Sequence, residues 1–160
     1  MRRWLVGGAL IRHGDGLVLV CNRRRDRTVE WTPPGGVIDR GETMLAGLAR
    51  EVREETGLTV EAWGSCCYTV SVQAPDMGWT LRVEAWEAQT VSGEIELADP
   101  DGIVEEVRHA SLAEAPGLLA QSPPWVHTPV GDWLLGNAAE RYQFVLHGTQ
   151  RGAARVERVV

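Results

Sequence analysis

The chain has 160 residues and a formal net charge of −6, a length typical of one ordinary domain. Its acidic balance argues against a nucleic-acid-binding protein, because the face that binds nucleic acid is normally basic. No stretch approaches the roughly 18 consecutive apolar residues of a membrane span, so no membrane partner is expected. With no targeting segment visible in the sequence, the cytoplasm is the expected compartment.

Three cysteines, Cys21, Cys66 and Cys67, form neither a CxxC pair nor an even framework. We therefore expect reduced thiols and no zinc site. All 16 basic residues are arginines, so a basic side chain that contacts phosphate must be arginine, which offers bidentate geometry.

The first third of the chain predicts a hairpin followed by an irregular segment. Residues 4–11 and 17–21 read as strands, joined by a Gly-Asp turn in residues 13–16. A charged, arginine-rich loop occupies residues 23–27. Prolines and glycines in residues 31–36 predict a rigid turn whose backbone can approach a ligand.

A helix is predicted to follow and to end at Gly57, which can adopt the positive φ of a helix C-terminus. Leu45, Leu48, Ala49 and Val52 recur at the i, i+3, i+4, i+7 spacing of one helical face. That face is expected to be buried.

The rest of the chain predicts mainly strands. Segments with strand character are residues 68–72, 79–91, 103–109 and 142–147, with a weaker one at 154–160. A short helix is expected from Ser111 to about Ala120, with Ser111 and Glu114 as a capping box. Residues 124–135 are expected to be helical but broken by Pro129 and Gly131. Strands around one early helix and later helices predict a mixed α+β sandwich.

The early helix carries Glu51, Glu54 and Glu55 on one side, within about 5–6 Å of each other. Like charges at this spacing destabilise a helix unless something neutralises them. Carboxylate oxygens gathered at one point suit Mg²⁺ or Mn²⁺. A solvated acidic face is the simpler alternative, but the preceding glycine turn, Glu42 and Arg50 favour a metal site.

Residues 36–58 read Gly-x5-Glu-x7-Arg-Glu-Val-x-Glu-Glu-x-Gly-Leu. This stretch resembles the signature of the Nudix hydrolases at every specified position. The resemblance implies an α/β/α sandwich with a mixed β-sheet, here as a single domain over residues 1–160. It also implies hydrolysis of a small-molecule substrate in which a nucleoside diphosphate is linked to another group. A homodimer is compatible with it, and beyond about Leu135 the resemblance implies little.

The same resemblance implies a role for each matching residue. Glu51, Glu54 and Glu55, with the backbone carbonyl of Gly36, would hold Mg²⁺, or Mn²⁺ in its place. Arg50 and Glu42 would pair to hold the loop against the helix and so orient the metal ligands. The catalytic set is therefore Glu54, Glu51, Arg50 and Glu42, and the glutamate that takes the proton of the attacking water is left open.

Substrate choice has one candidate mark. Pro75 lies 17 residues after Leu58, about the offset of a proline recognised in the ADP-ribose pyrophosphatase group. ADP-ribose or a related nucleotide sugar is therefore the first expected substrate, and an oxidised nucleoside triphosphate such as 8-oxo-dGTP is the second. A proline in a Pro-Asp-Met-Gly turn also needs no function.

Other substrate contacts are expected outside the signature. An exposed Trp79 could stack a base, although core packing is the commoner fate of tryptophan. Strand alternation places Arg82 on the opposite face from Trp79. One or two of the arginines in residues 23–27 could clamp phosphates. Glu105 and Glu106 precede a later strand, where several Nudix groups place an extra metal-binding or base glutamate, although exposed acids before a strand are also common. The candidate substrate-binding residues are Arg23, Arg25, Trp79, Arg82, Glu105 and Glu106.

A catalytically silent Nudix domain that binds a nucleotide and regulates a partner is the alternative of another class. Such domains usually lose a glutamate of the signature, and this chain retains them all. The basic tail formed by Arg151, Arg155 and Arg158 would be the place to look for a docking role.

Overall fold

The computed structural model describes residues 1–97, 100, 102–149 and 154–160. None of the helices in this described part is long and apolar enough to cross a membrane. In chain order the elements are β1 (Arg2–Leu10), β2 (Arg12–His13), β3 (Gly16–Arg23), β4 (Val29–Thr32), β5 (Gly35–Val37), α1 (Met44–Thr56), β6 (Thr59–Ala74), β7 (Trp79–Ser92), β8 (Val104–Ala110), α2 (Ala115–Leu119), α3 (Pro124–Leu134), β9 (Arg141–His147) and β10 (Arg155–Arg158).

Within the described residues, the strands form two sheets. The larger sheet has the order β10-β9-β6-β7-β1-β5, in which β1 pairs with β7, and β6 with β9, in parallel and the other neighbours are antiparallel. The smaller sheet is built on β3, which pairs with β2, β4 and β8. The larger sheet is therefore mixed, as expected.

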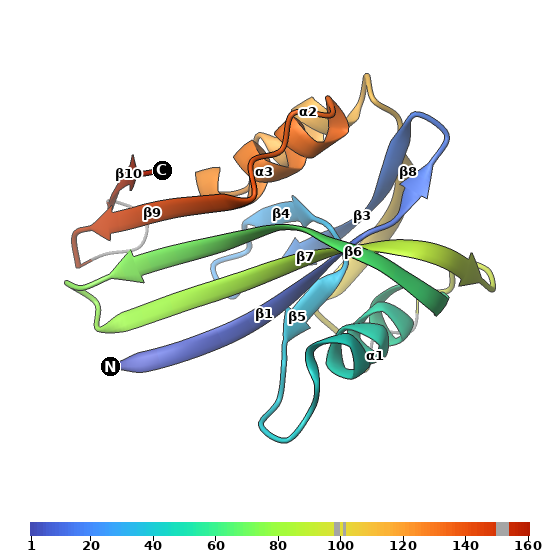
Figure 1. The fold of residues 1–160 in the computed structure, drawn as a ribbon, viewed down its shortest axis with the longest axis horizontal. Coiled ribbons are helices and arrows are strands. Elements are labelled where there is room, and N and C mark those ends of the chain that lie inside the picture. The colour runs from blue at the N-terminus through green and yellow to red at the C-terminus, as the bar shows by residue number, and fades with distance from the viewer. Residues whose placement is uncertain (98–99, 101, 150–153) are drawn as a thin grey trace.

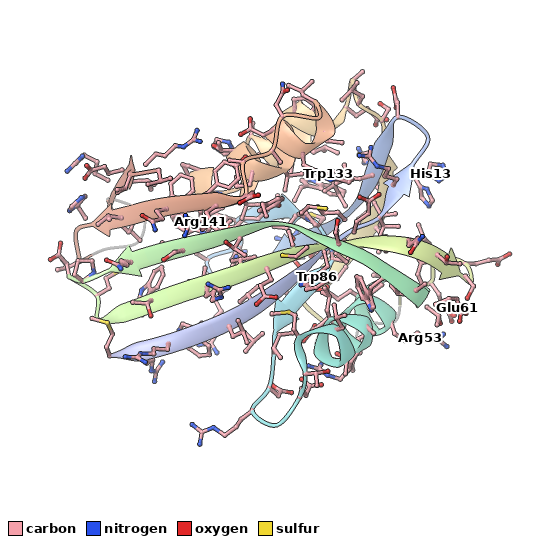
Figure 2. The ribbon with its side chains drawn as sticks, viewed as in Figure 1. His13, Arg53, Glu61, Trp86, Trp133 and Arg141 are labelled. Atoms are coloured by element: carbon pink, nitrogen blue, oxygen red, sulfur yellow. The ribbon has the colours of Figure 1, made fainter. Side chains whose placement is uncertain are left out.

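The helices lie on opposite sides of the sheets, with α1 on one side and α2 and α3 on the other (Figure 1). Alternation along the strands supplies two separate cores. Ala9 and Val18 pack with Leu48 of α1, whereas their neighbour residues Leu10 and Leu19 belong to the core that includes α2 and α3. Figure 2 shows Trp86 near α1, on the opposite side of the sheets from Trp133, which belongs to α3. The expected α/β/α sandwich is confirmed.

The Pro-Pro-Gly-Gly segment is more regular than the sequence predicts. It follows directly on β4, and its Gly35 and Gly36 begin β5, where they pair with Gly8 and Gly7 of β1. A Cβ on Gly35 would lie 2.0 Å from the carbonyl oxygen of Gly7, so these two backbones approach closely because no side chain separates them. The same glycines that indicate a turn in the sequence thus allow a close strand pairing.

The predicted break in the third helix is also wrong, because α3 is continuous from Pro124 to Leu134. Pro129 removes one backbone hydrogen bond from the helix interior. However, Pro129 and its neighbour Val130 are buried, as is Trp133 one turn later. We attribute the continuity of α3 to this packing, which outweighs the local cost of the proline.

The sequence underestimates β6, which extends from Thr59 to Ala74 and not only over residues 68–72. Register shifts interrupt its pairing with β7 between Val60 and Tyr68. Such bulges move side chains from one face to the other and so remove the regular alternation on which strand prediction depends.

Residues at both ends of α1 determine its limits. The hydroxyl of Thr43 accepts a hydrogen bond from the Ala46 backbone N–H at 3.2 Å. Gly57 has φ +80° and donates its N–H to the Arg53 carbonyl at 3.0 Å, as predicted for the helix end. On the predicted inner face, Leu48 and Val52 are fully buried, but Leu45 and Ala49 are only half-buried.

The helix end gives a stability prediction. Gly57→Ala should lower the free energy of unfolding by about 1–2 kcal/mol, because alanine is strained at positive φ. The added Cβ would also lie 2.9 Å from the Glu96 Cβ. Gly117→Ala in α2 is the matched control, since its Cβ enters open space and alanine favours a helix. Urea unfolding that shows equal stability for Gly57→Ala and the wild type would contradict this role.

Candidate active site

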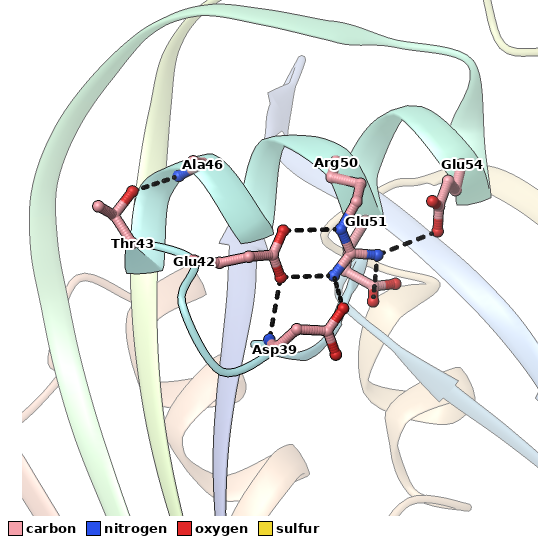
Figure 3. Close-up of polar contacts among 7 residues, drawn as sticks. All are labelled: Asp39, Glu42, Thr43, Ala46, Arg50, Glu51 and Glu54. Atoms are coloured by element: carbon pink, nitrogen blue, oxygen red, sulfur yellow. Dashed lines mark hydrogen bonds and ion pairs between the residues drawn. The ribbon is translucent and has the colours of Figure 1, made fainter.

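Arg50 joins α1 to the loop that precedes it. Its Nε and Nη2 donate to the two carboxylate oxygens of Glu42 at 2.9 Å each, in a bidentate ion pair (Figure 3). Glu42 in turn accepts the backbone N–H of Asp39 at 2.9 Å. Nη2 also lies 3.4 Å from the Asp39 carboxylate. We call this set the Arg50 clamp; it fixes residues 39–42 against the helix.

The same guanidinium reaches the acidic side of α1. Nη1 of Arg50 lies 3.1 Å from an oxygen of Glu51 and 3.3 Å from an oxygen of Glu54 (Figure 3). Bonding to Arg50 lowers the pKa of Glu42 to about 2, and the pKa of Arg50 is raised mainly by its hydrogen bond to Glu42. The clamp predicted from Arg50 and Glu42 is thus present, and it extends to two of the predicted metal ligands.

The acidic helix face meets the glycine strand. A Cβ built on Gly36 would lie 2.7 Å from the carboxyl carbon of Glu51, so only glycine allows this carboxylate to lie so close to the backbone. The carboxylate of Glu55, which is 8% exposed, accepts the backbone N–H of Gly35 at 2.8 Å. The structure therefore brings Gly36, Glu51 and Glu55 together, as the signature predicts.

The oxygen donors at this place fit a hard divalent cation. In the arrangement described for residues 1–97, 100, 102–149 and 154–160, no three His, Cys, Asp or Glu side chains form a cluster that could hold a metal ion. Glu54 bonds to Arg50 and Glu55 bonds to Gly35, so both carboxylates have protein partners. The residue types are those that bind Mg²⁺ or Mn²⁺.

A cavity of about 820 Å³ opens beside the acidic helix face. Its walls come from alternate residues of β1 and β7, from β6, β9 and α3, and from the β3–β5 region. Glu51 and Glu55 line it together with Gly36. Trp79 also lines it, but it is half-buried and packs against the core instead of being exposed. The acidic face and a largely apolar cavity therefore form one continuous site.

Several predicted substrate contacts lie elsewhere. Arg82 is exposed and does not line this cavity; its guanidinium lies 3.8 Å from Glu84 on the face of β7 opposite Trp79. Arg23 forms a bidentate ion pair with Glu105 across β3 and β8.

Three further predicted residues also lie away from the cavity. Glu106 pairs with Arg108 at 2.7 Å, and Arg25 and Pro75 are exposed residues outside the cavity lining. In the basic tail, Arg155 and Arg158 are the ends of β10, and Arg151 lies outside the described residues.

Other residues of the cavity are absent from the sequence-based site. Arg24 lines it, whereas the sequence favours Arg23 and Arg25. The Arg24 guanidinium lies 2.6 Å from the buried carboxylate of Glu30. Alternation in β1 is the signal that could have identified the aromatic wall formed by Trp4. Trp125 comes from α3, and no local pattern connects it to the acidic helix.

The Arg50 clamp predicts a pH dependence of stability. Because the pKa of Glu42 is about 2 in the folded protein against an ordinary 4.5, the folded state binds fewer protons between these values. The clamp stabilises the fold fully above about pH 4.5, and this contribution is lost as the pH falls through about 2. Glu42→Gln should therefore lose less stability than the wild type as the pH falls from about 4.5 to 2.

Urea unfolding at a series of pH values measures this difference. Glu140→Gln, which changes an exposed glutamate before β9, is the control and should follow the wild type. Identical pH dependence in Glu42→Gln and the wild type would show that the clamp does not contribute to acid sensitivity.

Comparison with known proteins agrees with this geometry. An RNA pyrophosphohydrolase of Caulobacter vibrioides (strain NA1000 / CB15N) is 31% identical over 127 residues, which cover 70% of this chain and 74% of the relative. A MutT-like protein of Streptomyces ambofaciens is 46% identical over 56 residues, covering 35% of this chain and 34% of the relative. The chain spans between 26% and 51% of the length of the first curated relatives it matches.

The fold is shared with solved structures. A MutT NUDIX hydrolase from Burkholderia pseudomallei superposes with a TM-score of 0.67 at 23% identity, over 87% of this chain and all of the other. The family model described as the NUDIX domain matches residues 1–134, most of the chain. The chain therefore belongs to the Nudix hydrolase family.

Proposed function

We propose that the protein is a Mg²⁺-dependent pyrophosphohydrolase that cleaves a nucleoside diphosphate linked to another group. The observation that carries this proposal is the meeting of Glu51 and Glu55 with Gly35 and Gly36 at the cavity wall. A site that combines oxygen ligands with an apolar cavity suits a substrate with a phosphate part and a planar organic part.

Each residue would contribute in a specific way. The carboxylates of Glu51, Glu54 and Glu55 and the carbonyl of Gly36 would hold Mg²⁺, or Mn²⁺ in its place. When bound, such an ion neutralises charge on phosphate oxygens and lowers the pKa of a coordinated water. One of the three glutamates accepts the proton of the attacking water, whose oxygen bonds to phosphorus as the anhydride bond breaks.

Arginines complete the site. Arg50 positions the carboxylates through its contacts with Glu42, Glu51 and Glu54, without touching the substrate. Arg24 lines the cavity and forms an ion pair with Glu30. Its guanidinium would pair with a phosphate group of the substrate.

The candidate substrates all contain a phosphorus anhydride bond, and they differ in the group linked to it. ADP-ribose or a related nucleotide sugar remains the first candidate on the offset of Pro75, which lies in the turn before Trp79. A triphosphate, including an oxidised one such as 8-oxo-dGTP, is the second candidate. It is supported by a relative from Mycobacterium tuberculosis named putative 8-oxo-dGTP diphosphatase 2, which is 43% identical over 56 residues. Another relative is named RNA pyrophosphohydrolase. The chain's net charge of −6 argues against extended contact with RNA itself.

A catalytically silent, nucleotide-binding domain is the competing proposal. Retention of every signature glutamate, with Glu51 and Glu55 at the cavity, favours the enzyme. The two proposals differ in a simple observable, because only the enzyme releases product in a Mg²⁺-dependent way.

A substrate screen with Mg²⁺ tests the function. Purified protein is offered ADP-ribose, nucleotide sugars, 8-oxo-dGTP, unmodified triphosphates and a short RNA with a 5′-triphosphate, and the products are separated by chromatography. On the best substrate, Glu54→Gln should reduce kcat by at least about 10²-fold, as expected for a metal ligand or general base.

Glu61→Gln is the matched control for this screen. Glu61 is exposed on β6, where its carboxylate accepts a hydrogen bond from Ser92 at 2.6 Å (Figure 2). This variant should keep wild-type kcat. No turnover of any substrate by the wild type would favour the silent binding domain, and unchanged kcat in folded Glu54→Gln would remove Glu54 from the site.

A further inference from the structure

Tyr68 has an unusual environment in the wall of the cavity. Its side chain lines the cavity but is only 5% exposed. Its ring packs edge-on against Tyr142, with centroids 5.7 Å apart. Within the described part of the chain, its hydroxyl has no hydrogen-bond partner. A buried hydroxyl without a partner is costly, so this position needs an explanation.

The hydroxyl must face the cavity. Among the described residues, every side-chain nitrogen or oxygen atom that is completely inaccessible to solvent has a hydrogen-bond partner. The unpaired hydroxyl of Tyr68 therefore has some accessible surface, and the cavity is the space that this buried residue lines. Its polar group is thus presented to whatever enters the cavity.

The most deeply buried hydrophobic side chains of the cavity lining are aliphatic. Those that are at most 2% exposed are Leu10, Val70, Ala85, Val130 and Leu146. All are aliphatic, so a group inserted among them must itself be largely apolar. Tyr68 supplies one directional contact within this apolar surface.

The aromatic residues of the lining suit a planar group. Trp4, Trp79 and Trp125 all line the cavity, and Trp4 is 41% exposed. Val37 and Ile103, exposed by 40% and 49%, are further apolar side chains of the lining. Aromatic rings accommodate the π-face of any nucleobase without distinguishing one base from another. Discrimination between bases must then come from hydrogen bonds.

We propose that Tyr68 is a specificity-determining residue whose hydroxyl donates a hydrogen bond to an acceptor atom on the nucleobase of the substrate. The acceptor is a carbonyl oxygen or ring nitrogen of a base inserted from the acidic end of the cavity. This inference rests on the proposed function, because it takes the cavity as the substrate site. Burial raises the pKa of Tyr68, so the hydroxyl keeps its proton and acts as a donor.

The same geometry explains why an acceptor is required. A base that presents only an amino group to Tyr68 would donate to the hydroxyl oxygen and leave its proton unpaired in an apolar wall. A site with a fixed donor discriminates against ligands that lack the matching acceptor, since the protein group is then left buried and unsatisfied.

Tyr68→Phe tests the proposal, because it removes only the hydroxyl and keeps the ring. We would measure binding of AMP, GMP, CMP and UMP by quenching of tryptophan fluorescence, in the absence of added metal. The wild type should prefer one or two bases. Tyr68→Phe should weaken binding of the monophosphate with the highest affinity about 3–10-fold, which is the contribution of one neutral hydrogen bond. The differences in affinity among the four bases should therefore become smaller.

Tyr142→Phe is the matched control. The Tyr142 hydroxyl donates to Asp132 at 2.8 Å and accepts the Ala139 N–H at 2.9 Å, and Tyr142 does not line the cavity. This variant should lose stability but keep the base preference of the wild type. Tyr68→Phe should show the reverse pattern, with unchanged or higher stability in urea, because its lost hydroxyl has no protein partner.

The outcomes separate this inference from the proposed function. Wild-type affinities for all four monophosphates in Tyr68→Phe, or no binding by the wild type, would overturn the role of Tyr68. Base-selective binding that depends on Tyr68, in a protein that hydrolyses nothing in the screen, would support the inference while the proposed function fails. With an active enzyme, Tyr68→Phe should raise KM for the preferred substrate and leave kcat nearly unchanged.

Discussion

Arg50 lies within ion-pair distance of the carboxylates of Asp39, Glu42, Glu51 and Glu54. Without the guanidinium at this point, Glu51 and Glu54, which lie one turn apart on α1, would repel each other. They would also repel the carboxylates of the preceding loop. The guanidinium can serve them together because its donors form a planar fork, which lysine does not have. The position of the acidic helix face relative to the glycine strand therefore depends on this one side chain.

The second requirement is close contact between backbones. The carboxylates of Glu51 and Glu55 lie against Gly36 and Gly35, and Gly35 in turn pairs with β1 at a distance that excludes a side chain. Alternate residues of β1 then extend from this point along the cavity wall, which continues over β7 and β6 to Tyr68. In this way one sheet face connects a site for a phosphate group with an apolar space of suitable size for a base.

The local parts of this arrangement could be predicted from the sequence, and the long-range parts could not. The helix, its end at Gly57 and the pair of Glu42 with Arg50 follow from fixed spacings within 23 residues. The cavity wall unites Trp4 with Trp125, which are far apart in the chain and share no local pattern. Arg24, and not its neighbours, reaches the cavity, and the register shift after residue 21 makes such a choice unpredictable from alternation alone.

The affinity for Mn²⁺, measured by isothermal titration calorimetry, tests the central role of Arg50 most directly. Arg50→Lys keeps the charge but loses the fork, so the account predicts an affinity about 10–100-fold weaker than that of the wild type. Arg53→Lys is the control, because Arg53 on the same helix is exposed and donates to the Thr59 hydroxyl at 2.8 Å (Figure 2). It should bind Mn²⁺ as the wild type does. Equal affinities of Arg50→Lys and the wild type would contradict the account.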